Sequence, residues 1–420
     1  MKDTYLAQFE KSKGGALADL RRRAIDRFAA LGFPTGREEE WRFTDVGPIA
    51  ETAFAAPNGA DASRLADFAK GPLRACQFTF IDGRFEPSLS SLKLPKSVAA
   101  GSLASFLAED PKRVEPHLAR HASFEKNTFA ALNTAFVRDG VFLHLPRGVK
   151  IDEPVHLLFL SAADGTPVVS HPRVLVIAEE GAQATIVESY LGPAGGTYFT
   201  NAVTEIVARE AAVIDYYKVQ RESPKAYHVA TVMAHLGRHA ALTSHSISLG
   251  AALARNDIGA VLDGEGADVT LNGLYEASAS QIVDHHTSID HAKPHGTSRE
   301  LYKGILNGKA RGVFDGRIVV RPDAQKTNAV QTNKNLLLSK DALVNTKPQL
   351  EINANDVKCK HGATIGQLDR DMLFYMRSRG LGNDDARRLL VHAFASEIID
   401  EVKVDAIRTQ LGGCLHILSS

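Results

Sequence analysis

The sequence predicts a mainly β protein whose centre is a parallel β-helix. From about residue 150, segments rich in β-branched residues follow one another without a helical pattern between them. Four of these segments align, and their first residues are spaced by 29, 28 and 28 residues: Gly181, Glu210, Arg238 and Gly266. A period of this length indicates stacked repeats, and units of short strands favour a β-helix over a propeller or a helical solenoid. A β-sandwich would also supply regularly spaced strands, but it requires no period.

The N-terminal region, residues 1–115, is predicted to be helical or α+β. Its first helix has an apolar face at three- and four-residue steps, and a glycine and a proline end it. These residues are Leu17, Leu20, Ala24 and Phe28, followed by Gly32 and Pro34. Further helices are expected at residues 103–107 and 124–132. The only tryptophan, Trp41, is expected to anchor this arm to the body of the protein.

Two Asp-Gly pairs predict tight β-hairpins, because such pairs readily adopt the positive φ angles that these turns need. One is Asp82-Gly83 and the other is Asp139-Gly140, and each is flanked by phenylalanines.

The β-helix core is expected to span residues 116–365, with a period that fades after residue 300. Residues 366–420 are predicted to form a small helical domain that protects exposed strand edges at one end of the β-helix. Leu368, Met372, Tyr375 and Met376 share one face of its first helix. The second helix is expected to start at Asn383. Its apolar stripe consists of Leu389, Leu390, Ala393, Phe394, Ile398 and Val402.

Composition excludes several classes of protein. Lys plus Arg and Asp plus Glu both number 49, so the chain lacks the excess of basic residues that is typical of nucleic-acid-binding proteins. No run of 18 apolar residues predicts a membrane span, and the polar N-terminus lacks the apolar segment of a signal peptide. The three cysteines, Cys76, Cys359 and Cys414, are widely spaced, which argues against a disulfide framework and favours the reducing cytoplasm.

No complete catalytic set is visible, so we predict a protein that is not an enzyme. The segment 304–310 is superficially like a phosphate loop, but it lacks the required spacing and the Ser or Thr after Lys309. We therefore expect no bound nucleotide. The motifs of zinc proteases, nucleophile elbows and dinucleotide-binding folds are also missing.

The sharpest chemical signal is Cys359-Lys360-His361. On a strand, Cys359 and His361 point to the same face, with Cα atoms roughly 6.5 Å apart. A thiolate and an imidazole could ligate one metal ion or cluster, but two ligands do not complete a four-ligand site. Lys358 and Lys360 would lie on the opposite face. From spacing alone, a buried cysteine beside a surface histidine explains the pattern better than a metal site does.

A second possible metal site is a group of histidines near Asp284 and Asp290. Imidazoles and carboxylates suit iron or zinc, although this spacing matches no fixed metal signature. The histidines are His285, His286, His291 and His295.

Several long motifs, in order, are similar to those of the SufB/SufD family of iron–sulfur cluster assembly scaffold subunits. They occupy residues 298–304, 325–338, 341–346, 347–352, 356–364 and 373–380, with a further match at Glu40-Trp41. The similarity extends from residue 37 to nearly the C-terminus and is strongest at residues 280–402. The Lys-Cys-x-His-Gly-Ala-Thr run resembles the SufD branch, although Lys360 stands where a small polar residue is usual.

This resemblance implies a right-handed β-helix and a complex with a SufB-like paralog and a SufC-like ABC ATPase. Within it, Cys359 and His361 correspond to residues proposed to hold iron or a nascent cluster, with the partner chain supplying further ligands. The C-terminal helices would dock the ATPase, whose ATP hydrolysis would drive assembly. The expected partner contacts are Met372, Phe374, Tyr375, Arg377, Arg379, Leu389 and Phe394.

The resemblance leaves some alternatives open. The chain could be the SufB-like paralog itself, and without its partner it could form a homodimer. A β-helix enzyme acting on carbohydrates is a further alternative, but neither a signal peptide nor a groove of carboxylates supports it.

Overall fold

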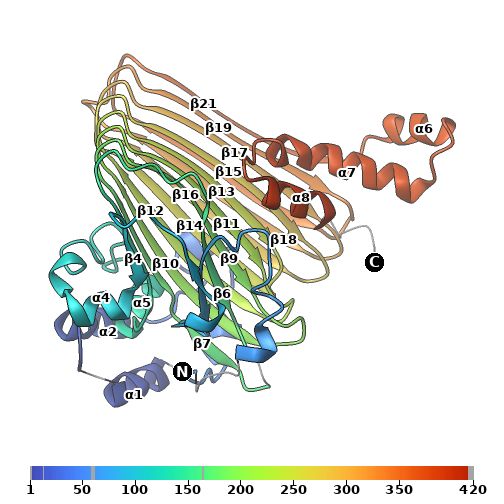
Figure 1. Ribbon diagram of the computed structural model, residues 1–420. Coiled ribbons are helices and arrows are strands. Elements are labelled where there is room, and N and C mark those ends of the chain that lie inside the picture. The colour runs from blue at the N-terminus through green and yellow to red at the C-terminus, as the bar shows by residue number, and fades with distance from the viewer. Residues whose placement is uncertain (1, 13, 58–61, 163–164, 415–420) are drawn as a thin grey trace.

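The computed structural model describes residues 2–12, 14–57, 62–162 and 165–414, and it confirms a mainly β protein built on a parallel β-solenoid. Successive strands alternate between two long sheets (Figure 1). The first sheet contains β1 (Cys76–Ile81), β2 (Arg84–Phe85), β3 (Ser91–Leu92), β6 (Val155–Leu160), β9 (Gln183–Leu191), β11 (Val213–Arg221), β13 (Ala241–Leu249), β15 (Asp268–Ala277), β17 (Thr297–Leu306), β19 (Asn328–Leu337) and β21 (Lys358–Gln367).

The second sheet faces the first across the apolar core. It contains β4 (Ala99–Ser102), β5 (Gly140–Leu145), β7 (Val168–Ser170), β8 (Arg173–Ala178), β10 (Tyr198–Ala208), β12 (Tyr227–Leu236), β14 (Leu253–Leu262), β16 (Ile282–His291), β18 (Arg311–Val320) and β20 (Leu343–Ile352). In both sheets, residues of alternate positions point inward, because side chains along a strand alternate between its two faces.

The predicted repeat is confirmed by the strand register. Val213 pairs with Gln183 and with Ala241, and Ala241 pairs with Asp268. The expected fading after residue 300 is wrong in the structure, since Asp268, Thr297, Asn328 and Lys358 continue the same column. The sequence hid this continuation because the spacing of the paired residues rises to between 29 and 31 residues in these turns.

One corner of every turn holds a residue in the left-handed conformation. Glycines, which tolerate positive φ without steric cost, and other residue types both occupy this corner along the solenoid. In chain order they are Gly148, Gly181, Ala211, His239, Gly266, His295 and Lys326. The amide of each corner residue donates to a carbonyl in the next turn, for example from Gly181 to Glu210 O at 2.9 Å and from His295 to Gln325 O at 2.9 Å. This ladder fixes the stacking of the turns.

Helices from the first 136 residues cover the outer face of the second sheet. They are α1 (Lys2–Ser12), α2 (Ala18–Leu31), α3 (Gly47–Glu51), α4 (Leu103–Glu109) and α5 (Thr128–Phe136), with 3₁₀ turns η1 (Glu39–Trp41), η2 (Ala62–Leu65), η3 (Pro87–Leu89) and η4 (Pro111–Arg113). The helix α1 was not predicted from the sequence, and α5 begins four residues later than expected. Trp41 is buried as predicted, against the Phe129 ring and with the Arg255 guanidinium 3.8 Å from its centroid.

The two Asp-Gly pairs behave differently. Asp82-Gly83 joins β1 to β2 in a hairpin, as predicted. The hairpin predicted at Asp139-Gly140 is wrong, because the chain there leaves α5 and enters β5. The Asp139 carboxylate accepts hydrogen bonds from the Phe85, Ala104 and Gly140 amides and from the Ser102 hydroxyl. Gly140 is required here because a Cβ would lie 1.8 Å from a carbonyl oxygen of the neighbouring strand.

The C-terminal helices are α6 (Arg370–Ser378), α7 (Asn383–Ile399) and α8 (Asp405–Cys414). The end of α7 and α8 pack on the outer face of the first sheet, while α6 extends away from the solenoid (Figure 1). The prediction that these helices cover the strand edges at one end of the β-helix is therefore wrong, because their apolar residues pack on a sheet face instead. The buried face of α7 is centred on Val391, Ala395 and Ile398, so the predicted stripe is only partly correct: Leu389 is half exposed. No helix in the described ranges is long and apolar enough to cross a bilayer. Cys76 and Cys359 are free thiols, and the side chain of Cys414 lies outside the described residues.

Candidate functional site

The last turn of the solenoid, formed by β20 and β21, is an open end. These are the terminal strands of the two sheets, so among the described residues no further turn covers their inward-facing side chains. Apolar side chains are exposed there, including Leu343, Ile352 and Ile365, with 53%, 42% and 50% of their surface accessible. Unpaired backbone groups on such a terminal turn are a ready template for another chain.

Cys359 and His361 lie at this open end on β21, two positions apart, so they share its inner face as predicted. Cys359 stacks on Ala329 of β19 and packs against the solenoid core, while His361 stacks on Gln331 and is exposed. Burial raises the pKa of the Cys359 thiol, which favours the protonated form in the isolated chain. A bound cation would favour the thiolate instead.

By themselves, Cys359 and His361 are too few to complete a metal site. In the described part of the chain, no three His, Cys, Asp or Glu side chains are grouped as metal ligands. A cluster or iron ion that occupied the Cys359–His361 pair would therefore need further ligands from elsewhere.

The four histidines of the second predicted metal site do not converge. His285 and His291 point into the solenoid, where His291 Nε2 contacts the Ser298 hydroxyl at 2.9 Å. His286 lies on the outer face and pairs with Asp284 at 3.1 Å, and His295 is a corner residue. This arrangement gives the predicted histidine metal site no shared set of ligands within the described residues.

Two polar residues that the sequence analysis did not single out lie beneath His361. The inward column of the first sheet runs from His361 to Gln331 on β19 and then to Glu300 on β17. Gln331 and Glu300 are 0% and 2% exposed. The Gln331 amide donates to Glu300 Oε2 at 2.7 Å, and burial raises the pKa of Glu300 to about 7. The sequence analysis missed these residues because their alignment depends on the pairing register of strands that are about 30 residues apart in the chain.

Polar side chains continue along the interior below this column. Tyr275 donates to Asn335 at 2.6 Å, and Asn335 donates to Asn333 at 2.6 Å. Farther from the open end, the ammonium group of Lys218 donates to Asn256 at 2.8 Å and contacts His228 Nε2 at 2.7 Å. The interior is thus not a uniform apolar core.

The predicted partner contacts fall into two groups. Met372, Phe374, Tyr375 and Leu389 are 48%, 72%, 55% and 50% exposed, and Arg377 and Arg379 are also exposed. Phe394, in contrast, is half buried against the solenoid: its carbonyl accepts from Lys303 at 2.7 Å, and its ring lies 4.6 Å from that ammonium group.

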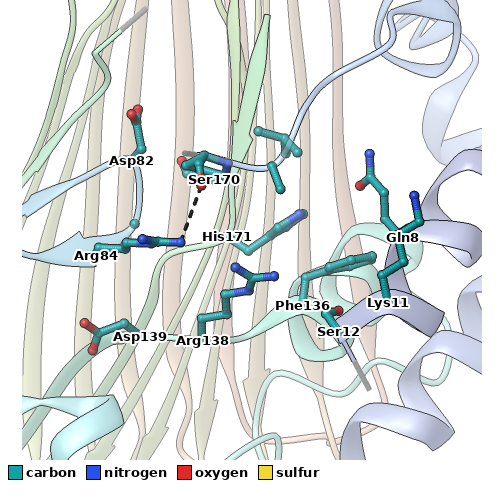
Figure 2. A pocket seen from close by; sticks show the side chains of 14 residues that line it. Gln8, Lys11, Ser12, Asp82, Arg84, Phe136, Arg138, Asp139, Ser170 and His171 are labelled. Atoms are coloured by element: carbon teal, nitrogen blue, oxygen red, sulfur yellow. Dashed lines mark hydrogen bonds between the residues drawn. The ribbon is translucent and has the colours of Figure 1, made fainter. Parts of the chain in front are cut away.

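A separate cavity of about 200 Å³ lies between α1, the β1–β2 hairpin and the start of β5 (Figure 2). Lys11, Arg84, Arg138 and His171 line it. The Arg84 guanidinium donates to Pro57 O at 3.4 Å, and the His171 ring stacks on Phe136. None of the residues predicted from the sequence to bind metal lines this cavity.

Comparisons with known proteins match nearly the whole chain. The family model of the SufBD core domain of the SUF iron–sulfur cluster assembly system matches residues 159–394, and that of the SufBD N-terminal region matches residues 4–157. A SufBD family protein of Synechocystis is 35% identical, covering 97% of this chain and 92% of its own. The iron–sulfur cluster assembly protein SufD of Escherichia coli is 30% identical, covering 92% of this chain and 89% of its own. SufD of Bacillus subtilis is 25% identical, covering 77% and 74%.

Proposed function

The chain belongs to the SufBD family of iron–sulfur cluster assembly proteins, and from this premise we propose that it is a SufD-like, non-catalytic scaffold subunit. Its working state is a cytoplasmic complex with a SufB-like paralog and a SufC-like ABC ATPase. Iron or a nascent cluster passes through this complex as cargo and is not a resident cofactor of the chain.

The observation that carries this proposal is that two possible metal ligands, too few for a complete site, lie on the last turn of the solenoid, which no further described strand covers. Cys359 and His361 share the inner face of the terminal strand β21. The exposed Leu343, Ile352 and Ile365 around them supply apolar surface for an interface. A SufB-like chain that covered this end would bury that surface and bring the missing ligands. Without that partner, a second copy of the chain could occupy the same end.

The C-terminal helices supply a second proposed interface. The exposed apolar residues of α6 and the start of α7, together with Arg377 and Arg379, would dock the ATPase. Residues 366–420 therefore act as the docking domain in this proposal, next to a core of residues 116–365 and an N-terminal region of residues 1–115.

A mechanical link supports the coupling of ATP hydrolysis to the open end. On α7, Glu397 pairs with Lys303 of β17 and with Lys334 of β19, the latter at 3.1 Å. The strand β19 is the direct neighbour of β21, which carries Cys359 and His361. Movement of α7 by the ATPase would thus act on the strands that hold the ligand pair.

Cluster assembly tests the ligand pair. The double variant Cys359→Ser, His361→Ala should abolish cluster formation in the purified complex, measured anaerobically by absorbance and by iron content, while all subunits still co-purify. The matched control is Lys358→Ala, Lys360→Ala on the opposite face of β21, which should assemble clusters normally. Full cluster assembly by the first variant would reject the site.

Co-purification from the native host tests the partners. The tagged full chain should bring down a SufB-like protein and an ABC-type ATPase, and Phe374→Ser with Tyr375→Ser should lose the ATPase alone. Phe68→Ser, which changes an exposed aromatic residue of the N-terminal region, should keep both partners. Recovery of neither partner by the unmodified chain would overturn the scaffold proposal.

A further inference from the structure

We infer that Glu300 and Gln331 form an inner oxygen-donor site that takes a ferrous ion directly beneath the Cys359–His361 pair. This inference rests on the proposed function and deepens it, since it gives iron a first position inside this chain. Gln331 lies one turn below His361, and Glu300 lies two turns below it, on the same inward-facing column.

Unused acceptors are the first argument. The Gln331 amide nitrogen donates to Glu300 Oε2, and the Thr287 hydroxyl of β16 lies close enough to the Glu300 carboxylate to lower its pKa. Glu300 Oε1 and Gln331 Oε1 are both buried and form no hydrogen bond of normal geometry among the described residues. A buried acceptor without a donor destabilises the folded protein. Two such oxygens on neighbouring strands therefore form a place where a cation would be stabilised.

A second buried carboxylate in the same sheet has a different set of hydrogen bonds. Glu188 on β9 is also fully buried and inward-facing. It accepts hydrogen bonds from the hydroxyls of Tyr190, Thr204 and Tyr216, those from Thr204 and Tyr216 at 2.9 and 2.8 Å. Glu188 thus receives three hydroxyl hydrogen bonds, whereas Glu300 receives one amide hydrogen bond and the Thr287 contact, and its Oε1 has no hydrogen bond of normal geometry among the described residues.

The second sheet makes room for the inner site. Gly316 on β18 lies where a Cβ would come within 2.4 Å of the Gln331 amide nitrogen. A larger residue would force the Gln331 side chain out of its position over Glu300. The glycine thus keeps the amide and the carboxylate together.

The donor types and the charges indicate the ligand. Carboxylate and amide oxygens suit hard and borderline divalent cations such as Fe²⁺ and Mn²⁺, whereas the outer thiol and imidazole suit a sulfur-containing cluster. None of the described residues that shift the pKa of Glu300 is cationic, so its negative charge is not balanced by a neighbouring side chain. The buried Lys218 deeper in the solenoid would repel a cation, which limits the site to the open end.

Anaerobic metal binding by the full chain tests the inference. Fe²⁺ affinity is measured by titration calorimetry, and Mn²⁺ affinity by the loss of its free-ion electron paramagnetic resonance signal. Glu300→Gln should weaken both at least tenfold. Glu188→Gln, the same change at the satisfied carboxylate, should leave both affinities unchanged. Thermal unfolding verifies that each variant is folded, and Gln331→Leu repeats the test if Glu300→Gln does not fold.

Three results would overturn the inner site: wild-type affinity in Glu300→Gln, equal losses in Glu300→Gln and Glu188→Gln, or no binding of either metal by the unmodified chain. None of these results concerns the proposed function, which fails only if the Cys359 and His361 double variant still assembles clusters or if the partners are missing. The two failures are therefore distinguishable.

Discussion

The two ends of the solenoid differ in where their ion pairs lie: one end contains a buried pair and the other an exposed pair. At the covered end, which we define as the turns from β8 to β10 beneath the N-terminal helices, Glu205 receives the Arg173 guanidinium and the amides of Ala119, His121 and Ala122. Both side chains of this ion pair are no more than 1% exposed. At the open end, the pair of Lys326 and Asp356 is more than half exposed.

This difference shows which end of the solenoid is covered by the chain itself and which end is not. Although burial raises the pKa of Glu205, the guanidinium and the amides together hold it below its usual range. At the covered end, the charge of the buried carboxylate is thus balanced within the chain. At the open end, apolar side chains and the proposed ligands Cys359 and His361 lie on a turn that no further described strand covers.

The largest effect is expected from breaking the buried pair at the covered end. Glu205→Gln should destabilise the protein by about 3–5 kcal/mol, because it leaves the Arg173 guanidinium buried without a counter-charge. Urea unfolding followed by circular dichroism measures the loss. The control is Glu210→Gln, which breaks an exposed pair with Arg238 and should cost far less. Equal losses in the two variants would contradict the assignment of Glu205 as a central link between the N-terminal region and the solenoid.

Local patterns in the sequence predicted several features of the fold. The repeat period, the Trp41 anchor and the Asp82-Gly83 hairpin were all predicted from local patterns. The hairpin at Asp139-Gly140 failed because turn propensity cannot reveal that the carboxylate is used to cap backbone amides from two other segments. Similarly, the apolar stripe of α7 includes Leu389, which is exposed because the sheet does not extend beneath it.

The candidate site was predictable only in its outer part. The alternation of a strand places Cys359 and His361 on one face from the sequence alone. Glu300 and Gln331 belong to other turns, and the corner residues that set the register, such as Ala211, His295 and Lys326, share no residue type. Burial of Glu300 follows from that register and not from its neighbours in the sequence.

An intermediate effect is expected from the pH dependence of the buried Glu300. Its folded pKa of about 7 lies above the usual value near 4.3, so the folded state binds more protons between these values. Stability should therefore fall by about 3 kcal/mol as the pH rises from about 4.5 to 7. Urea unfolding at a series of pH values measures this slope.

Two variants sharpen that result. Glu300→Gln cannot lose a proton, so it should flatten the slope and should be more stable than the unmodified chain above pH 7. Glu188→Gln should reduce stability, by about 1–3 kcal/mol for the disrupted hydroxyl network, and keep the slope. An unchanged slope in Glu300→Gln would mean that the carboxylate is solvated and that the contrast between the two glutamates is wrong.

The smallest effect is expected from the ion pair at the open end. Asp356→Asn removes the same kind of interaction as Glu205→Gln, but both partners at this end are exposed, so solvent screens the attraction. The loss should stay below about 1 kcal/mol and should vanish in 1 M salt. The amide of Lys326 also donates to the backbone carbonyl of Asp356 at 2.6 Å, and this hydrogen bond survives the substitution. The corner of the last turn is therefore held mainly by its backbone. A salt-independent loss of several kcal/mol, measured by the same unfolding experiment, would mean that the open end is as tightly locked by charge as the covered one.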